Sequence, residues 1–462
     1  MIQKEIWADY RDRGCIYLKY IVMIMFVMCI LHVTVSYYIY SSLPYSEVFF
    51  KIEHYLFLCF ALLIPLCLVR LFVSIDRKEF WNYIKSLLCK EQILLIAMFV
   101  LSVLSVIVSY PGTNDNWVSM NKEYLFDFGI AVFIFFPLGR YLYKYDSSKI
   151  IKFLFRAFIV LNSLLMIWII VAVFQHKTIQ LLNNCEISMG QQLQINCNPN
   201  RVGMYMLIVF FVSILASFYV SGILKYIYWF SAVICFLILL LSNSRASFIG
   251  TVCGIALAVG IYFFSKMQCL KLWQRWCILI GTMVISAVLL ILFRSLFFTV
   301  YESTFVSETT VIRDLDPTST SGRIDIWIKS IKTVFSDAKS ILIGASPAGT
   351  SDAINIYVGT QKIVNSHNQF IEIALATGIP GLIVFIIWTL FLAKNCIFLD
   401  LNKNIAVDYK IKFATVIILA IMVNNLAEAR LFYSGQLMGV GFAVLAGWVT
   451  SAFYSAAKNT AK

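Results

Sequence analysis

Five basic residues, far apart in the sequence, border long apolar runs or open a loop helix. They are Arg201, Arg245, Arg323, His367 and Arg430. A guanidinium forms paired hydrogen bonds to phosphate oxygens and stays charged in a poorly solvated site. The four arginines therefore predict a binding site for a phosphate or diphosphate group. Histidine exchanges a proton near neutral pH, so His367 is a candidate general base, with Asn368 and Glu372 as supporting residues.

Each of these residues also has a structural alternative. A single arginine at a membrane interface often extends its charge to the lipid headgroups, and this alternative stays open for Arg201 and Arg430. Arg245 is different, because it lies in a short polar segment, 242–247, between two strongly apolar runs. That setting favours a role inside a protein cavity or interface. A lone histidine is more often structural, but His367 stands beside an asparagine at the junction between a loop and an apolar run.

The elements that must position these residues are membrane spans. Hydrophobic residues make up 61% of the 462 residues, charged residues 13%, and the mean hydropathy is +0.84. A soluble core could not bury this much apolar surface. The predicted fold is all-α, a polytopic membrane helix bundle with about 12 transmembrane helices of about 20 residues each. The predicted spans are 17–40, 55–75, 92–110, 124–143, 151–174, 201–221, 226–242, 247–264, 277–293, 371–393, 412–427 and 435–456.

Lysine and arginine predict the orientation of the spans. Most of the basic residues outside the long polar loop fall on the side that holds both termini, so both termini are predicted to be cytoplasmic. The predicted domains are a first transmembrane part, 1–293 with spans one to nine, an extracytoplasmic loop, 294–366, and a last transmembrane part, 367–462 with spans ten to twelve. The net charge of +13 indicates anchoring to anionic lipid and not nucleic acid, because the basic residues are spread over many short loops.

The long loop contains one clear helical pattern. Apolar residues recur there at helical spacing and predict an amphipathic helix from about Arg323 to Phe335. The residues of this apolar stripe are Ile324, Trp327, Ile328, Ile331 and Val334. A glycine-rich turn at 344–349 follows. The segment Asn365-Ser366-His367-Asn368 then supplies polar caps for the helix that returns to the membrane.

Two of the cysteines lie in a polar segment, 183–200, on the predicted outer side. Cys185 and Cys197 could form a disulfide there, and two free thiols in a loop are the alternative. The spacing of cysteines and histidines suggests neither a zinc site nor a redox centre. We therefore predict no metal and no cofactor.

Three motifs follow one another in a fixed order along the chain. They are Asn243-Ser244-Arg245-Ala246-Ser247, Ser321-Gly322-Arg323-Ile324-Asp325-Ile326-Trp327, and His367-Asn368-Gln369-Phe370-Ile371-Glu372 with Gly378-Ile379-Pro380-Gly381. With the predicted topology, they resemble the O-antigen ligase and polymerase superfamily of bacterial membrane glycosyltransferases over about residues 198–381. The first five spans carry no motif of this kind.

The resemblance implies an activity and a set of partners. The chain would transfer a glycan from an undecaprenyl diphosphate carrier to an acceptor hydroxyl, at the outer face of the bacterial cytoplasmic membrane and without a metal. The acceptor would be a glycan or the lipid A core of lipopolysaccharide. The resemblance also implies that Arg245 and Arg323 hold the diphosphate and that His367 takes the proton from the acceptor hydroxyl.

The sequence leaves alternatives open. A ligase and a repeat-unit polymerase share these motifs and differ in their acceptors. A metal-dependent glycosyltransferase would use paired carboxylates, and Asp314-Leu315-Asp316 is formally such a pair, although a solvated or helix-capping pair is the favoured interpretation. A lipid-linked oligosaccharide flippase or transporter would also be a large apolar bundle. Transporters tend to carry ionisable groups at mid-membrane, however, and the predicted spans are nearly free of them.

Overall fold

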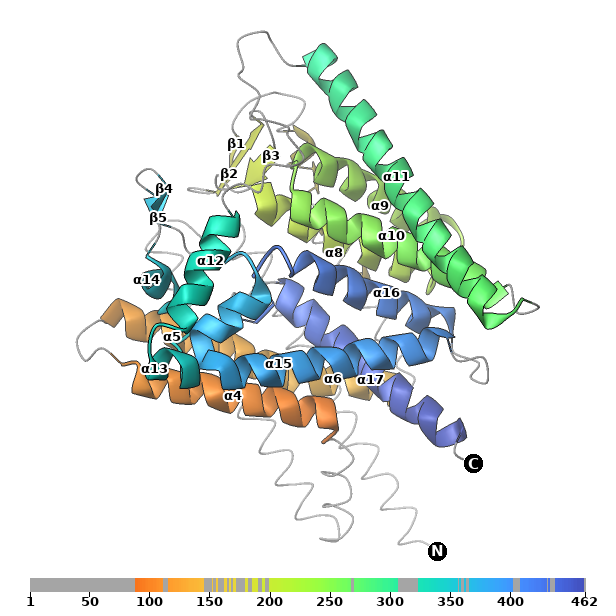
Figure 1. The fold of residues 1–462 in the computed structure, drawn as a ribbon. Helices are drawn as coiled ribbons and strands as arrows, with labels where there is room; N and C mark the ends of the chain where they lie inside the picture. The colour runs from red at the N-terminus through yellow and green to blue at the C-terminus, as the bar shows by residue number, and fades with distance from the viewer. Residues whose placement is uncertain are drawn as a thin grey trace, which may run out of the picture.

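The structure is a computed structural model (Figure 1). It describes residues 88–110, 115–144, 199–266, 270–305, 323–355, 365–401, 408–429 and 437–460, with short pieces between 152 and 195 and at 357–362 and 431–432. The predicted spans at 17–40 and 55–75 lie outside the described residues, and most of the span at 151–174 does too.

The described chain is mainly helical, as predicted. The helices are α4 (Lys90–Val108), α5 (Asp115–Ile130), the π-helix η1 (Ala131–Phe135), α6 (Phe136–Lys144), α8 (Pro199–Ser217), α9 (Ile223–Leu241), α10 (Arg245–Lys266), α11 (Leu272–Phe305), α12 (Arg323–Val334), α13 (Ala338–Leu342), α14 (Thr350–Ile354), α15 (Gln369–Leu401), α16 (Tyr409–Asn424) and α17 (Leu437–Thr460). The long helices form a bundle in which α15 packs along α4, α17 along α6, and α10 against both α11 and α16.

Five helices within the described ranges are long and apolar enough to cross a membrane. They cover Lys90–Val108, Ile223–Leu241, Arg245–Phe263, Trp276–Leu296 and Gln369–Ile397. These segments agree closely with the predicted spans at 92–110, 226–242, 247–264, 277–293 and 371–393. The total of about 12 spans remains a prediction.

Two small antiparallel sheets accompany the helices, and the sequence did not predict them. Strands β1 (Ile179–Leu181), β2 (Cys185–Met189) and β3 (Leu193–Ile195) pair in that order, and β4 (Tyr357–Val358) pairs with β5 (Gln361–Lys362). The segment expected to be a polar loop therefore contains a meander. The predicted Cys185–Cys197 disulfide cannot be placed in it, because Cys197 lies outside the described residues and so does the side chain of Cys185.

Helix α15 is broken by a glycine close to its N-terminal end. Gly378 has φ 71° and ψ −173°, and Pro380 follows it. A Cβ at Gly378 would lie 2.6 Å from the carbonyl oxygen of Ile341. The backbone of the α13 turn packs directly into this break: the N–H of Ala345 donates to the Leu375 carbonyl at 2.7 Å. The break is thus the place at which the α13 turn is held against α15.

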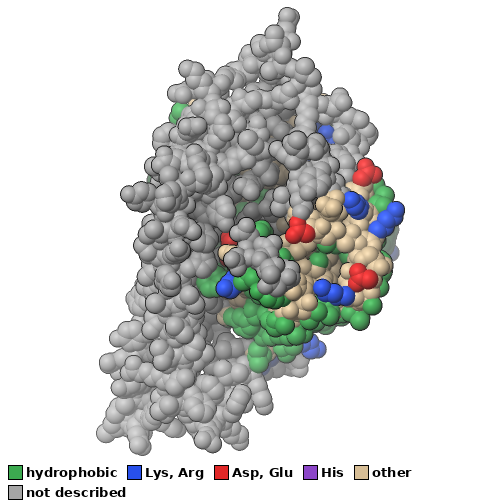
Figure 2. Space-filling view, turned by 90° about the vertical axis from the view of Figure 1, so that its left-hand side faces the viewer, with side chains coloured by type: hydrophobic (Ala, Val, Ile, Leu, Met, Phe, Trp, Pro, Cys, Tyr) green, Lys and Arg blue, Asp and Glu red, His purple; other side chains and the backbone are tan. Residues whose placement is uncertain are grey.

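Helices α12, α13 and α14 gather at one end of the bundle, over the first part of α15 (Figure 1). Viewed onto this end, the described surface carries lysine, arginine, aspartate and glutamate side chains among polar and hydrophobic ones (Figure 2). Asp337 caps α13 by accepting the N–H of Ser340 at 2.8 Å, and this hydrogen bond lowers the pKa of Asp337. These short helices form a polar cap on an otherwise apolar bundle.

The predicted helix at 323–335 is confirmed as α12, and its predicted apolar stripe is only partly buried. Ile324, Ile328 and Ile331 are about half exposed, whereas Val334 of the stripe is buried together with Ile326 and Ser330. The buried side is the one that packs on α14 and α15. Packing against α14 and α15 therefore decides which side of α12 is buried, and the position of its apolar residues alone does not.

Candidate active site

A buried glutamate connects two of the predicted site residues. Glu428, in the loop after α16, is only 1% exposed. Its Oε1 accepts a hydrogen bond from Arg323 Nη2 at 2.9 Å, and its Oε2 lies 3.4 Å from His367 Nδ1. The structure thus brings Arg323 and His367 to the two oxygens of one carboxylate. Glu428 was not among the predicted site residues. An acidic residue inside the largely apolar run 414–433 was a signal that could have pointed to it.

Arg323 is held in this place by its position as the first residue of α12. Its Nη1 donates to the carbonyl oxygen of Ala427 at 2.7 Å, so the guanidinium grips both the backbone and the side chain of the loop after α16. These two hydrogen bonds use two of its five N–H donors. The Arg323 side chain is 19% exposed, so part of it remains accessible to a ligand.

His367 lies on a sharp turn before α15. Its φ of 51° is in the left-handed region, and its N–H donates to Asn365 Oδ1 at 3.0 Å. A carboxylate only accepts hydrogen bonds, so contact with Glu428 favours the tautomer with the proton on Nδ1. In the neutral ring Nε2 then carries the lone pair. The side chain is 26% exposed, so an acceptor substrate can reach it.

The two supporting residues hold the turn that carries His367. Asn368 Oδ1 accepts the N–H groups of Phe370 and Ile371 at the start of α15, and Asn368 Nδ2 donates to the carbonyl of Leu426 at 2.9 Å. The predicted cap is therefore confirmed, and the same side chain ties the His367 turn to the Glu428 loop. Glu372 is buried and lies behind the turn.

Glu372 links the His367 turn to the polar cap. Its Oε2 accepts the N–H of Ser366 at 2.8 Å, and its Oε1 accepts the hydroxyl of Thr350, in α14, at 2.7 Å. Trp327, in α12, donates from Nε1 to the Ser366 carbonyl at 3.0 Å. Residues of α12, α14 and α15 thus hold the His367 turn in place. Glu372 helps to hold this turn and does not face the Arg323–Glu428 pair.

The other predicted arginines lie elsewhere or cannot be placed. Arg245 is the first residue of α10, and Gly250 on the next turn packs against Asn424 of α16, four residues before Glu428. Arg245 therefore stands at the same end of the bundle as Glu428. The backbone of Arg201 lies in the first turn of α8, but its side chain is outside the described part, as are Arg430 and the Asp314–Asp316 pair.

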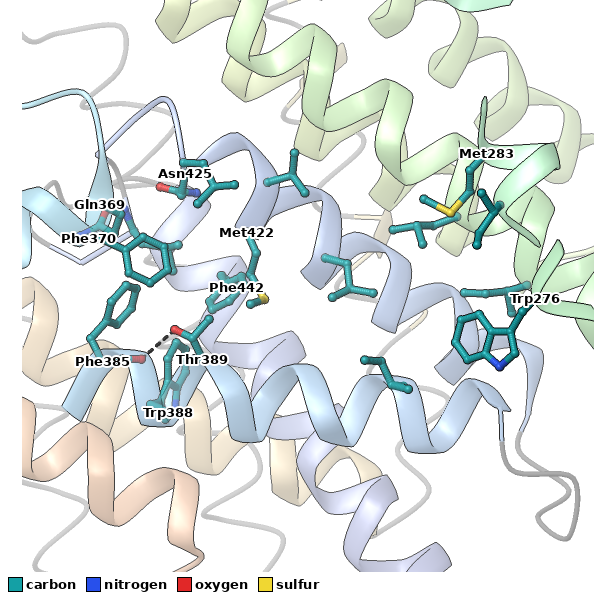
Figure 3. Close-up of a pocket in the computed structure, with 18 residues that line it drawn as sticks. Trp276, Met283, Gln369, Phe370, Phe385, Trp388, Thr389, Met422, Asn425 and Phe442 are labelled. Carbon is teal, nitrogen blue, oxygen red and sulfur yellow. Dashed lines mark hydrogen bonds between the residues drawn. The ribbon is translucent and has the colours of Figure 1, made fainter. Parts of the chain in front are cut away.

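An apolar cavity of about 540 Å³ begins beside this site (Figure 3). Gln369 and Asn425 line one end, next to the His367 turn, and Trp276 and Met283 of α11 line the other. Phe370, Phe385, Trp388, Met422 and Phe442 form much of the wall between them. The Gln369 N–H donates to the Asn425 carbonyl at 3.0 Å and closes the polar end. The shape and lining suit a long hydrocarbon chain, with its polar head at the His367 end.

Part of the chain that holds this site is similar to a known protein family. A protein-family model described as O-antigen ligase matches residues 230–386. This segment of the chain is similar to the O-antigen ligase family. The match contains Arg245, Arg323 and His367 and confirms the resemblance to the O-antigen ligase superfamily. No curated protein matches the chain.

The O-antigen ligase match and the apolar helices together indicate a membrane-embedded bacterial protein of the glycosyltransferase type that acts in polysaccharide biosynthesis. The family implies a lipid-linked glycan and a glycan acceptor as substrates in general terms. Glu428 lies beyond the matched segment, so the domain's Arg323 and His367 are joined by a residue of the C-terminal part of the bundle.

Proposed function

We propose that this chain transfers a glycan from an undecaprenyl diphosphate carrier to an acceptor hydroxyl at the outer face of the cytoplasmic membrane, without a metal ion. The observation that carries this proposal is the pairing of Arg323 and His367 on the two oxygens of the buried Glu428. It puts a fixed positive charge and a proton acceptor side by side. A reaction that releases a diphosphate and deprotonates a hydroxyl needs both.

In the proposed reaction, His367 Nε2 takes the proton of the acceptor hydroxyl. The acceptor oxygen then forms a bond to the anomeric carbon, while the bond between that carbon and the diphosphate oxygen breaks. The bond's electron pair leaves with the diphosphate, and Arg245 and Arg323 stabilise its charge. Single displacement inverts the configuration at the anomeric carbon. Glu428 stabilises the protonated imidazole that forms.

The remaining site residues have subordinate roles in this proposal. Arg201 and Arg430 are expected to contact the diphosphate or nearby phosphates, and Asn368 and Glu372 keep the His367 turn in place. The apolar cavity between α15, α16 and α11 would take part of the polyprenyl chain. In this proposal, the polyprenyl chain lies on the cavity side of the Gln369–Asn425 contact, and the diphosphate lies on the His367 side.

The proposal is tested by in vitro transfer with the purified full-length protein. A defined undecaprenyl diphosphate oligosaccharide is supplied with either lipid A core or a second lipid-linked repeat unit as acceptor, with and without chelator. We expect a covalent product, identified by mass spectrometry, that forms equally in chelator. Product with lipid A core indicates a ligase, and product with the second repeat unit a polymerase. Translocation of the lipid without a covalent product from either acceptor would overturn the proposal in favour of a flippase.

A further inference from the structure

A second arginine reaches the start of α10 from a different helix. Arg294 lies in α11, two residues before the end of its apolar segment Trp276–Leu296. Its Nη2 donates to Asn243 Oδ1, and its guanidinium lies 5.4 Å from the centre of the Phe248 ring. Asn243 and Phe248 flank Arg245 in the sequence. The side chain of Arg294 therefore lies across the first turn of α10, beside Arg245.

Anchoring to lipid headgroups does not explain this geometry. The neighbours of Arg294 on α11, Ile291, Leu292 and Leu296, are 57%, 55% and 67% exposed, as expected for a helix that faces lipid. An arginine that serves as an interfacial anchor extends along that exposed side into the headgroups. Arg294 instead turns inward, to contacts on α10, and is only partly exposed.

Arg294 contacts residues on both sides of Arg245 in the sequence, so the two positive charges lie near each other. Both side chains are partly buried. Like charges in a poorly solvated place repel each other, and a ligand with two negative groups between them removes this repulsion. Two guanidinium groups together offer the paired donors that match the oxygens of two phosphates. The side chain of Asn243, whose φ is 49°, accepts the hydrogen bond that holds Arg294 at this place.

The same two helices also line the apolar cavity further inside. Leu257 and Ile261 of α10 and Met283 of α11 are among its lining residues. Met283 lies 11 residues before Arg294 on α11, a helical rise of roughly 16 Å. Helices α10 and α11 run side by side (Figure 1). A lipid that places its chain in the cavity can therefore extend along α10 and α11 to the two arginines.

We propose that Arg294 is a further diphosphate-binding residue, which grips the polyprenyl diphosphate together with Arg245. This inference rests on the proposed function and adds to it a residue from outside the three motifs. In this arrangement Arg245 and Arg294 bind the diphosphate from the α10–α11 side, and Arg323 contacts it from the side of His367 and Glu428.

Binding of farnesyl diphosphate to the purified full-length protein in detergent tests the inference. We expect Arg294→Ala to weaken binding by roughly tenfold or more, the range for a lost hydrogen bond between charged groups. Arg294→Lys should recover only part of the affinity, because an ammonium keeps the charge but not the paired donors. Lys122→Ala, which removes an exposed positive charge on α5, is the matched control and should bind like the wild type. Thermal unfolding of each variant shows whether it is folded, and Arg294→Gln replaces any variant that is not.

A double variant distinguishes a shared ligand from two separate ones. If Arg245 and Arg294 grip one diphosphate, Arg245→Ala with Arg294→Ala should lose less affinity than the product of the two single losses. Inorganic pyrophosphate should compete with farnesyl diphosphate, whereas phosphatidylglycerol micelles should not. Competition by phosphatidylglycerol would assign Arg294 to bulk lipid and overturn the inference.

Unchanged binding by Arg294→Ala would also overturn the inference, and it would leave the proposed function intact as long as the wild type still transfers glycan. The converse result is equally distinct. If the wild type binds farnesyl diphosphate through Arg294 but forms no covalent product with any acceptor, the proposed transfer reaction fails and the binding site stands.

Discussion

Glu428 is the residue on which the candidate site depends most directly. It is buried, and one oxygen contacts a permanently charged guanidinium while the other contacts an imidazole. A buried carboxylate with such partners can orient the histidine ring and select its tautomer. The contact with His367 is long, at 3.4 Å, as is common in a site without its substrate.

Replacement of His367 should remove turnover and leave donor binding largely unchanged. We expect His367→Ala to lower the transfer rate by about 10²–10⁴-fold, the range for loss of a general base. Donor affinity should persist because the arginines supply the charge that binds diphosphate. The rate is measured by product formation and the affinity with farnesyl diphosphate. Near wild-type turnover in this variant would exclude His367 as the base.

Glu428→Gln should slow transfer without weakening donor binding to the same degree. The amide keeps the size of the side chain but loses its charge, and it can donate as well as accept, so the tautomer of His367 is no longer selected. We expect a fall on the order of 10²-fold or more, as for other carboxylates that orient a catalytic imidazole. A changed pH–rate profile, partly restored in Glu428→Asp, would separate positioning from a merely structural role. Asp325→Asn, on the exposed side of α12, is the control and should behave as wild type.

The break in α15 is where the polar cap of α12, α13 and α14 joins the helix bundle. Gly344 and Gly378 both have positive φ, and each lies where an added Cβ would meet the other segment's backbone at 2.6 Å. Ser105 of α4 donates to the Ala376 carbonyl at 2.6 Å and accepts the N–H of Ser346 at 3.0 Å. The cap, α4 and α15 therefore meet at one point. The position of α12, and of Arg323 with it, depends on this junction.

Gly378→Ala should destabilise the protein and lower its activity. Its backbone conformation, with φ 71° and ψ −173°, costs a non-glycine residue about 1–3 kcal/mol, and the clash with the Ile341 carbonyl adds to this cost. Unfolding of the purified protein in detergent, followed with heating, measures the effect. Gly281→Ala in α11 is the matched control, because no atom lies within 4 Å of its added Cβ. We expect that variant to be neutral or slightly stabilised, by up to about 1 kcal/mol. Equal stability of the two variants would show that the junction does not hold the cap.

The molecule as a whole separates apolar spans from a polar end. Arg245, Arg323, His367 and Glu428 come from helix ends or loops, and Arg294 lies near the end of the apolar segment of α11. The helices expose large hydrophobic residues, most of all along α11. Such an exposed apolar surface is expected where lipid covers the protein. The proposed reaction then takes place at one end of the bundle, and the cavity extends from there into its interior.

Labelling of introduced cysteines tests which face this is. If the cap is extracytoplasmic, an impermeant thiol reagent should modify Lys332→Cys, on exposed α12, in intact cells. It should not modify Lys271→Cys, at the opposite end of α11, until the cells are opened. Labelling of the parent protein gives the background from its own cysteines, among which Cys277 is exposed. Modification of Lys271→Cys alone in intact cells would reverse the orientation.

The sequence by itself determined the features that depend on local length and chemistry. An apolar run of about 20 residues is enough to predict a span, because the thickness of the bilayer sets its length. This is why the spans at 92–110 and 371–393 match α4 and the apolar part of α15. The start of α12 at Arg323 and the cap by Asn368 also follow from residues within one turn. The motif order pointed to Arg245, Arg323 and His367 for the same reason, since each motif is local.

Only the tertiary structure decided which of these local features meet. Glu428 joins Arg323 and His367 across separations of 105 and 61 residues, and no local pattern encodes such a contact. The sequence predicted that α12 is amphipathic but not which of its apolar residues are buried: Val334 packs with residues of α14 and α15, whereas Ile324, Ile328 and Ile331 are about half exposed. In a membrane protein, lipid and protein interior are similarly apolar, so hydrophobic pattern alone does not distinguish a packed face from an exposed one. Arg294 was passed over for this reason: its helix looks like any lipid-facing span until its side chain is seen to turn toward α10.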